Sequence, residues 1–328
     1  LISVAQEVLS TLFNSSEIRD NVKESRFSKG YECPKCQCKD VNKNGKSNGR
    51  QRYICKRCRT SFDEFTMSPF SNTKLGLDKW IKYCELMILG LSIRKCAEEV
   101  GVGVKTSFYM RHRILDVINL SLKNDKVEGI VEVDECFIKE SFKGNHSKST
   151  TFVMPRNPRK RGKGKNDKKK RGISKEQICI ETAIDRKGNI LMSAVCNGRI
   201  TTNQIINFFD NKICEDATFC VDSHKSYMAI KDKLNIELKQ VPRGKSMIDS
   251  VYHLQHINAL HSSFKRWLMT FNGVSTKYIN NYLAWFKFLQ LSKKNKKNDR
   301  IKDMLVNVAT KDTYVTRATI RNRFIELI

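Results

Sequence analysis

The sequence lacks long apolar runs and any sign of an export signal. Nowhere in its 328 residues does it approach the roughly 18 uninterrupted apolar residues that a membrane-spanning helix requires. Residues 1–16 have neither a basic start nor a cleavage-like site, so we do not expect a signal peptide. We therefore expect a protein that neither spans a membrane nor is exported across one.

Acidic residues are scarce. The chain has 34 aspartates and glutamates against 61 lysines and arginines, which gives a formal net charge of +27. Such an excess of positive charge favours a polyanionic partner, and nucleic acid is the usual one. The alternative is a basic protein whose charge serves solubility alone. The length allows two or three domains with at least one sizeable core.

The twelve cysteines do not follow the pattern of a disulfide-rich secreted protein. Four of them occur as two Cys-x-x-Cys pairs, and the others are scattered singly through apolar stretches. Isolated cysteines of this kind suit core packing in a reducing cytoplasm.

The two Cys-x-x-Cys pairs lie within residues 27–66 and predict a zinc ribbon. They are separated by 18 residues, a spacing at which four thiolates can close a tetrahedral zinc site. The predicted Zn²⁺ ligands are Cys33, Cys36, Cys55 and Cys58. Cys38 has the wrong spacing from Cys36 to join them. Lysine and arginine are frequent in this segment, which favours DNA contact, although a purely structural ribbon is also common.

A helix-turn-helix is predicted within residues 70–122. The predicted helices are 77–89, 93–100 and 104–120. Ser92 suits the N-cap of the second helix, and Gly101–Gly103 forms the turn before the third. The DNA contacts expected on the third helix are Lys105, Thr106, Ser107, Arg111 and Arg113. The alternative is an ordinary three-helix packing unit without DNA contact.

An acidic strand at residues 130–137 is the most informative stretch. Its alternating, β-branched residues predict a buried or half-buried strand, where a carboxylate is costly unless it is paired or binds a cation. Asp134 on this strand and Asp222 at the end of a later strand can meet at one edge of a sheet. There they would hold Mg²⁺ or Mn²⁺. Two such ions ~4 Å apart support cleavage and joining of phosphodiester bonds.

Residues 127–290 alternate strands and helices. Their order is strand, hairpin, helix, strand, helix, strand, helix. This order predicts an α/β fold with a mixed sheet and flanking helices, as in ribonuclease H-like domains. The predicted organisation is an N-terminal helix in 1–26, a zinc ribbon in 27–66, a helix-turn-helix in 70–122, a catalytic domain in 127–290 and a basic helical tail in 291–328.

A strongly basic segment interrupts the predicted catalytic domain. Residues 154–172 contain ten lysines and arginines against one acid, with no apolar period. Such a segment cannot form a core and is usually a solvated loop. Beside a metal site, we interpret it as a clamp for DNA phosphates. The DNA contacts predicted here and on a later helix are Arg159, Arg161, Lys169, Arg171 and Arg266.

The third metal ligand is expected on a helix at 251–269. There is no glutamate in residues 250–284, so the ligand cannot be the usual third acid. Asn258 is the candidate, and Lys265 lies two helical turns later on the same face. Lys265 could hold the scissile phosphate. His261 lies between them and could be a ligand, a phosphate contact or a proton shuttle.

Other acids lie near the predicted site. Glu135 ranks second to Asp134, because alternation along a strand places it on the opposite face. Glu132 shares the face of Asp134 but lies deeper in the strand. Glu181 and Asp185 are predicted to be ordinary polar positions. His253 and His256 are predicted to be surface or packing residues.

Together these motifs resemble those of a known family. The paired cysteines, the helix-turn-helix, the Val-Asp-Glu strand, the Met-Pro-Arg loop and the block HINALHSSFKRWL…FNGVSTKYINNYLAWF are similar to bacterial insertion-sequence transposases. The resemblance is to the group that carries a zinc ribbon and an Asp-Asp-Asn catalytic set followed by a lysine. It covers about residues 30–290 and leaves the tail uncovered.

The resemblance implies a DDE-type DNA transposase with a ribonuclease H-like core and Mg²⁺ dependence. Such an enzyme binds the terminal inverted repeats of its element, cleaves the ends and joins the 3′-hydroxyls to target DNA. The catalytic residues would be Asp134, Asp222 and Asn258, with Lys265 as the trailing lysine. We expect a location in the bacterial cytoplasm with the nucleoid. Because two ends must be brought together, we also expect a dimer or larger homo-oligomer on double-stranded DNA.

Two other functions remain open. A DNA-binding transcriptional regulator derived from a transposase would use the ribbon and the helix-turn-helix alone, and the missing third acid keeps this alternative open. A hydrolytic nuclease would cleave DNA without joining strands.

Overall fold

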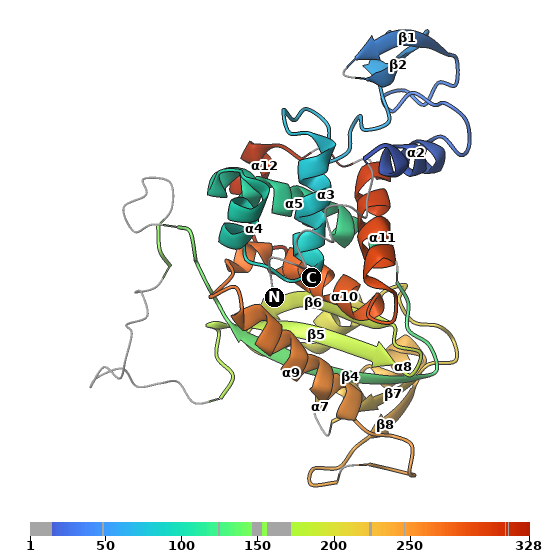
Figure 1. Cartoon of the computed structure of the whole chain (residues 1–328). Coiled ribbons are helices and arrows are strands. Elements are labelled where there is room, and N and C mark those ends of the chain that lie inside the picture. Colours follow the sequence, from blue (N-terminus) through green and yellow to red (C-terminus); the bar gives the residue numbers. More distant parts are fainter. Residues whose placement is uncertain are drawn as a thin grey trace. The chain divides into compact units, whose positions relative to one another are not determined.

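The computed structural model describes residues 15–328 except 48, 124, 146–152, 156–171, 223–224, 246, 312 and 314. The chain divides into two compact units. Unit 1 comprises the N-terminal part up to Ser121 together with Ser292–Asn322, and unit 2 comprises Leu122–Leu291 and Arg323–Ile328 (Figure 1). Residues 1–14 of the predicted N-terminal helix lie outside the described residues, as does most of the basic segment 154–172.

The cysteine-rich part of unit 1 is a small antiparallel sheet. Its strands are β1 (Val41–Ser47), β2 (Arg50–Cys55) and β3 (Ser61–Phe62), in the order β1-β2-β3. Gly49 adopts a φ of +72° in the turn between β1 and β2, a value that glycine reaches without strain. Tyr53 and Phe62 are buried between the strands and the cysteines. This apolar core is too small to hold a fold of this size alone.

The rest of unit 1 is helical. Its helices are α2 (Ser15–Arg26), α3 (Leu77–Ile88), α4 (Ile93–Val100), α5 (Val104–Ser121), α11 (Lys297–Thr310) and α12 (Arg317–Arg321). Helix α11, from the predicted tail, packs against α2, α3 and α5. Ile301, Met304, Leu305 and Val308 on α11 are completely buried. The tail is therefore part of the core of unit 1.

Helix α4 has the boundaries that its sequence predicts. The Ser92 side chain accepts a hydrogen bond from Lys95 N, which confirms the predicted N-cap. Gly101 ends the helix with a left-handed φ of +67°, and α5 begins three residues later.

Unit 2 is built on a mixed five-stranded sheet, as predicted. The strands are β4 (Ile130–Lys139), β5 (Gln177–Asp185), β6 (Ile190–Asn197), β7 (Thr218–Val221) and β8 (Glu237–Gln240). Their order is β6-β5-β4-β7-β8. β4, β5 and β6 pair antiparallel, whereas β4 with β7 and β7 with β8 pair parallel.

Helices cover both faces of this sheet (Figure 1). They are α6 (Thr202–Phe209), α7 (Lys225–Met228), α8 (Lys231–Leu234), α9 (Gln255–Met269), the 3-10 turn η1 (Thr276–Tyr278) and α10 (Ile279–Leu291). One core cluster joins Val131 and Val133 of β4 to α6 and α7. The other joins Cys136 of β4 to α9 and α10. Because side chains alternate along a strand, Asp134 shares the α9 face with Cys136.

Among the described helices, none is both long and apolar enough to cross a membrane.

Candidate active site and metal centres

One predicted catalytic aspartate, Asp134, lies on β4, and the other, Asp222, directly follows the neighbouring strand β7. β4 and β7 run parallel with Glu132 beside Cys220, and Asp134 and Asp222 each follow two residues later. Continuation of that register places the two carboxylates side by side. The charge of Asp222 is close enough to raise the pKa of Asp134. The sequence prediction that strand pairing brings these acids together agrees with this geometry.

Asp134 is poorly solvated for a carboxylate. Its side chain is 23% exposed, and Oδ1 accepts a hydrogen bond of 2.9 Å from Glu135 N. Burial raises the pKa of Asp134 to about 7, and the charges of Glu135 and Asp222 add to this effect. Lys265 acts in the opposite direction. Bringing a hard divalent cation to these oxygens would stabilise the ionised form.

Helix α9 places a histidine next to Asp134. His261 Nδ1 lies 3.7 Å from Asp134 Oδ2, and the His261 side chain is 8% exposed. Burial lowers the pKa of His261 to about 4, helped by the charge of Lys265, so the ring is neutral at pH 7. Within the described part of the chain, Nε2 has no hydrogen-bond partner. A buried neutral imidazole of this kind can bind a metal or accept a proton.

The other predicted α9 residues share this side of the sheet. Lys265 lies close enough to the Cys136 thiol on β4 to oppose the rise in its pKa that burial causes. Asn258 is exposed and precedes His261 by three residues, about one helical turn. Arg266 is also exposed. The face of α9 that carries Lys265 and His261 therefore lies over the strand that carries Asp134.

Behind the aspartates is a buried acid that sequence reasoning misjudged. Glu181 on β5 is completely buried and pairs directly across from Glu135 on β4. The Tyr227 hydroxyl donates to Glu181 Oε1 over 3.1 Å. Burial, with the charge of Glu135, raises the pKa of Glu181 well above its ordinary value. The prediction of an ordinary polar position is wrong, because packing on both sides of β5 excludes water from this side chain.

Asp185 is likewise more than an ordinary polar residue. It is 3% exposed at the end of β5. Its carboxylate accepts hydrogen bonds from Asn189 N at 2.9 Å, Asn189 Nδ2 at 2.7 Å and Glu128 N at 3.2 Å. Asp185 therefore holds the turn between β5 and β6 and joins it to the start of β4.

A second polar cluster forms around Glu132, which is 1% exposed on β4. Glu132 Oε1 lies 2.7 Å from His256 Nδ1 and 3.3 Å from His253 Nδ1. Oε2 accepts a hydrogen bond of 3.0 Å from Ile257 N, and the Arg186 guanidinium forms an ion pair with the carboxylate. Alternation along the strand predicted that Glu132 lies on the same face of the sheet as Asp134, but the sequence did not predict which residues contact Glu132. No local pattern marks Arg186, because its role depends on distant residues.

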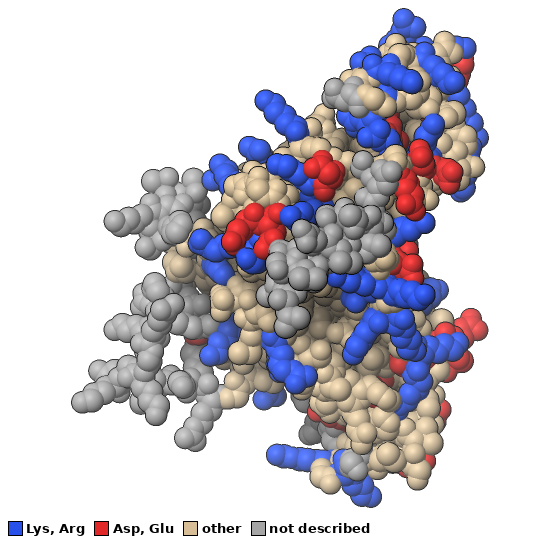
Figure 2. All heavy atoms as spheres, in the orientation of Figure 1, with Lys and Arg blue, Asp and Glu red and all other residues tan. Residues whose placement is uncertain are grey.

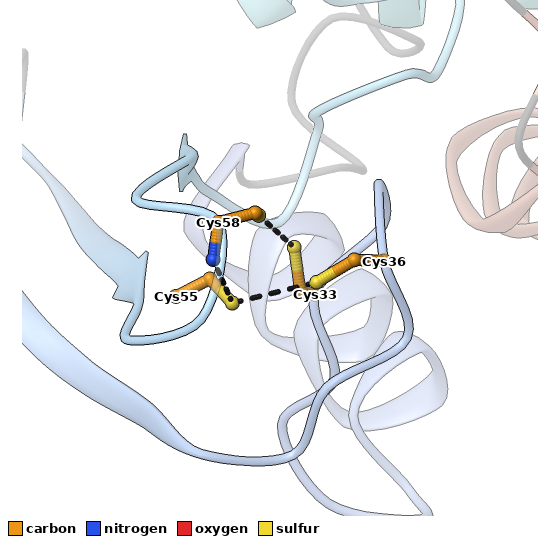
Figure 3. Close-up of side chains that lie close together, drawn as sticks. All are labelled: Cys33, Cys36, Cys55 and Cys58. Carbon is orange, nitrogen blue, oxygen red and sulfur yellow. Dashed lines mark hydrogen bonds between the residues drawn. The ribbon is translucent and has the colours of Figure 1, made fainter.

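The four predicted zinc ligands converge in unit 1 (Figure 3). All four sulfurs lie within 4.8 Å of one another. Cys33 Sγ is 3.5 Å from Cys58 Sγ, and Cys36 Sγ is 3.6 Å from Cys55 Sγ. Ligands at the usual Zn–S distance in a tetrahedron are roughly 3.8 Å apart. The four thiols therefore fit a structural Zn²⁺ ion.

The two Cys-x-x-Cys segments repeat the same backbone geometry. Gln37 and Arg59, each following the second cysteine of its pair, adopt φ values of 59° and 58°. Gln37 N donates to Cys33 O, and Arg59 N donates to Cys55 O, both over 2.9 Å. Two equivalent turns thus present their thiols to one point, which a redox pair or chance cysteines would not require.

The same repeat explains why Cys38 lies outside the group of four thiols. Cys38 occupies the position that Thr60 has in the second segment, and both residues accept a hydrogen bond from the first cysteine of their segment through the backbone carbonyl. The Thr60 hydroxyl lies 3.2 Å from Cys58 Sγ. Cys38 is outside the group of four converging thiols among the described residues, as its spacing predicted.

Two of the predicted DNA contacts on α5 are interior residues. Ser107 and Arg111 are completely buried. Ser107 Oγ donates to Ile93 O over 2.8 Å, and Arg111 Nη2 donates to Leu91 O over 2.6 Å. The prediction for this pair is wrong, because both side chains bind the backbone before and at the start of α4 instead of facing solvent.

The remaining DNA-contact predictions have mixed positions. Lys105 is exposed and Thr106 is half-buried near the start of α5. Arg113 is half-buried and donates to Pro69 O and Ser71 O over 3.1 and 3.3 Å. The predicted basic-loop contacts Arg159, Arg161, Lys169 and Arg171 lie outside the described residues.

The family model and a curated relative agree with the insertion-sequence resemblance. An uncharacterized protein in the transposable element ISH50 of Halobacterium salinarum is 25% identical over 264 residues, which cover 80% of this chain and 86% of that protein. A chain in the crystal structure of a pre-cleavage Mos1 transpososome aligns with 67% of this chain and 75% of its own length, at 13% identity and a TM-score of 0.24. The ISXO2-like transposase domain matches residues 126–290, which hold the mixed sheet and the paired aspartates. The chain belongs to the family of ISXO2-like transposases.

Proposed function

We propose that this protein is a DDE-type DNA transposase that binds the terminal inverted repeats of its element, cleaves the ends and joins their 3′-hydroxyls to target DNA. The observation that carries this proposal is that Asp134, on β4 beneath α9, lies close to Asp222, which directly follows the adjacent parallel strand β7. The family match covers the same residues. Two neighbouring carboxylates, one of them poorly solvated, suit divalent-metal chemistry at phosphorus.

The strand order supports a ribonuclease H-like core. Three antiparallel strands, β6-β5-β4, continue into the parallel strands β7 and β8. Asp134 lies on the central strand β4, and Asp222 follows its neighbour β7. Helix α9 then crosses the face that carries Asp134. This arrangement brings residues from three distant segments to one place.

Within this site, Asp134 and Asp222 would hold Mg²⁺ or Mn²⁺. Asn258 would supply a third, uncharged oxygen ligand, and His261 is the alternative third ligand. Bound divalent ions activate the attacking oxygen and stabilise the leaving oxygen. Lys265, near Asp134, would hold the scissile phosphate. Neutral His261 would accept a proton or complete the ligand set.

Unit 1 would bind the transposon ends. Its four thiols would hold a structural Zn²⁺, and α4 with α5 would form a helix-turn-helix. Lys105 and Thr106, near the start of α5, remain the proposed groove contacts there. Figure 2 shows lysine and arginine side chains over much of the visible face, with acidic side chains in smaller groups. Because two ends must react together, we propose that the active form is a dimer or larger oligomer on DNA.

Replacing Asp134 by asparagine tests the assignment. We expect Asp134→Asn to lower Mg²⁺-dependent cleavage of a DNA fragment carrying the element's end by at least about 100-fold, because the metal loses a charged ligand. Binding of the same fragment, measured by fluorescence anisotropy, should be unchanged. The matched control is Glu237→Gln, an exposed acid on β8 of the same sheet.

Three outcomes would decide against this proposal. Full cleavage by the Asp134→Asn protein would rule out the proposed site. Specific binding by the wild type without any Mg²⁺- or Mn²⁺-dependent nicking would indicate the transcriptional regulator instead. Cleavage without joined products would indicate a nuclease. Comparing Asn258→Ala with His261→Ala in Mg²⁺ then identifies the third ligand.

A further inference from the structure

The N-terminus of helix α9 is not capped by the side chain of its own N-cap residue. Leu254 occupies the N-cap position, and within the described residues no side chain at that position caps the helix. The first backbone N–H groups of a helix have no partner inside the helix and need one elsewhere. The first intrahelical bond of α9 is from Asn258 N to Leu254 O, so the amides before it depend on outside acceptors.

Two side chains supply these acceptors. Ile257 N donates to Glu132 Oε2 over 3.0 Å, and Gln255 N donates to His253 Nδ1 over 3.3 Å. Glu132 comes from β4, more than 120 residues earlier in the chain. Its negative charge also interacts favourably with the positive end of the α9 dipole. The start of α9 is therefore capped by the strand that carries Asp134.

Arg186 binds both the Glu132 carboxylate and the segment that precedes α9. Its guanidinium contacts Glu132 and His256, and Nη2 donates to Val251 O over 3.1 Å. Arg186 lies in the β5–β6 turn that Asp185 holds. The buried charge of Glu132 is thus balanced, and the segment before α9 is bound to the sheet.

We infer that Glu132 is a positioning residue that sets the start of α9 relative to Asp134. Glu132 and Asp134 lie two residues apart on one face of a strand, a spacing of roughly 7 Å that a paired strand holds rigidly. The same helix carries Asn258, His261 and Lys265. The Glu132–Ile257 bond therefore sets how far along the strand these three residues meet Asp134. This inference rests on the proposed function.

A metal ion held by Glu132, His253 and His256 is the competing interpretation, because their ligand atoms lie within 4.8 Å of one another. Two observations favour the cap. The Arg186 guanidinium already supplies the positive charge beside Glu132. Burial and Arg186 lower the pKa of His253, and its Nδ1 accepts the Gln255 amide instead of facing a cation.

Hydrogen exchange tests the cap without relying on catalysis. In Glu132→Ala, we expect the amides of residues 255–258 to exchange about tenfold faster or more, as the loss of a charge-assisted hydrogen bond implies. Glu132→Gln keeps an acceptor oxygen and should change exchange less. The matched control is Glu128→Gln, which removes a nearby acid that pairs with Lys187 at 2.8 Å and should leave α9 unchanged.

Cleavage assays test the positioning. We expect Glu132→Ala to lower the maximal cleavage rate about 100-fold, as misplaced catalytic groups do, with end-DNA affinity unchanged and partial recovery in Glu132→Gln. Unchanged exchange in a folded Glu132→Ala protein would overturn the cap. Faster exchange with a normal cleavage rate would overturn the positioning role. A metal bound by wild type and lost in His253→Ala would overturn both. If wild type itself does not cleave, the proposed function fails while exchange still tests the cap.

Discussion

At the residue scale, burial separates the acids of the site from the other acids of a basic protein. Burial raises the pKa values of Asp134, Glu135 and Glu181, and their charges reinforce one another. Glu128, in contrast, pairs with Lys187 near the surface. An acid in the first group destabilises the fold when it ionises, unless a cation or a proton compensates it. Such a cost is expected where function requires the group.

Glu181→Gln should make the protein less sensitive to alkaline pH. The pKa of Glu181 is raised on folding, so the folded state holds the proton more tightly than the unfolded chain. The free energy of unfolding therefore falls as pH rises above about 4.3, which is the pKa of a glutamate in the unfolded chain. Glutamine mimics the protonated acid and should raise the melting temperature by a few degrees at pH 8 and little at pH 4, measured without divalent metal. A variant less stable than wild type at pH 8 would contradict this account.

At the element scale, two parts of the fold depend on side chains as well as on backbone hydrogen bonds within the element. The small sheet β1-β2-β3 encloses only a few buried aromatic side chains beside its four thiols. Helix α9 takes its N-terminal hydrogen-bond acceptors from Glu132 and His253. Removing those contacts should loosen the element before the unit around it.

Removing zinc should unfold the ribbon alone. We expect about one Zn²⁺ per chain, and its removal by a chelator should increase hydrogen exchange throughout β1 and β2, because segments below about 40 residues usually need a metal or disulfide. Cys58→Ser should have the same effect, whereas Cys38→Ser should retain zinc. Metal content is measured by elemental analysis. Equal zinc loss in both variants would contradict the four-thiol assignment.

At the scale of the whole molecule, the chain leaves unit 1 at residue 121 and returns to it at residue 292. Most of unit 2, Leu122–Leu291, is therefore inserted between two parts of unit 1, and the last residues, Arg323–Ile328, belong to unit 2 again. The returning helix α11 packs against α2, α3 and α5, and its Ile301, Met304, Leu305 and Val308 are completely buried. The tail thus completes a core whose other helices come from the opposite end of the chain.

Deleting residues 292–328 should unfold unit 1. Burial of a Val, Leu, Ile or Met side chain is worth about 1.5–3 kcal/mol, so four such losses are comparable to the whole stability of a domain. We expect the shortened protein to lose specific end-DNA binding and to be cleaved by trypsin within α3 and α5. Replacing the exposed Lys293 and Lys294 by glutamine is the control and should leave the fold intact. A protease-resistant unit 1 after the deletion would show that the tail is dispensable.

Much of the site was predictable because its signals are local. The Cys-x-x-Cys spacing predicted four thiols that do converge, and Ser92 caps α4 as its sequence indicated. Alternation along residues 130–137 placed Asp134 and Glu135 on opposite faces, and the paired strands agree with this. These features depend on neighbours in sequence and on the repeat of a helix, strand or turn.

The sequence by itself therefore determined the elements, their order, the paired aspartates and the family. Only the tertiary structure decided which polar residues are buried and what they contact. In the folded protein, Ser107, Arg111 and Glu181 are completely buried. Glu132 accepts a hydrogen bond from the first turn of α9, and α11 packs against the other helices of unit 1. The physical reason is that a residue's solvation and its distant partners depend on how whole elements pack, which spacing along the chain does not encode.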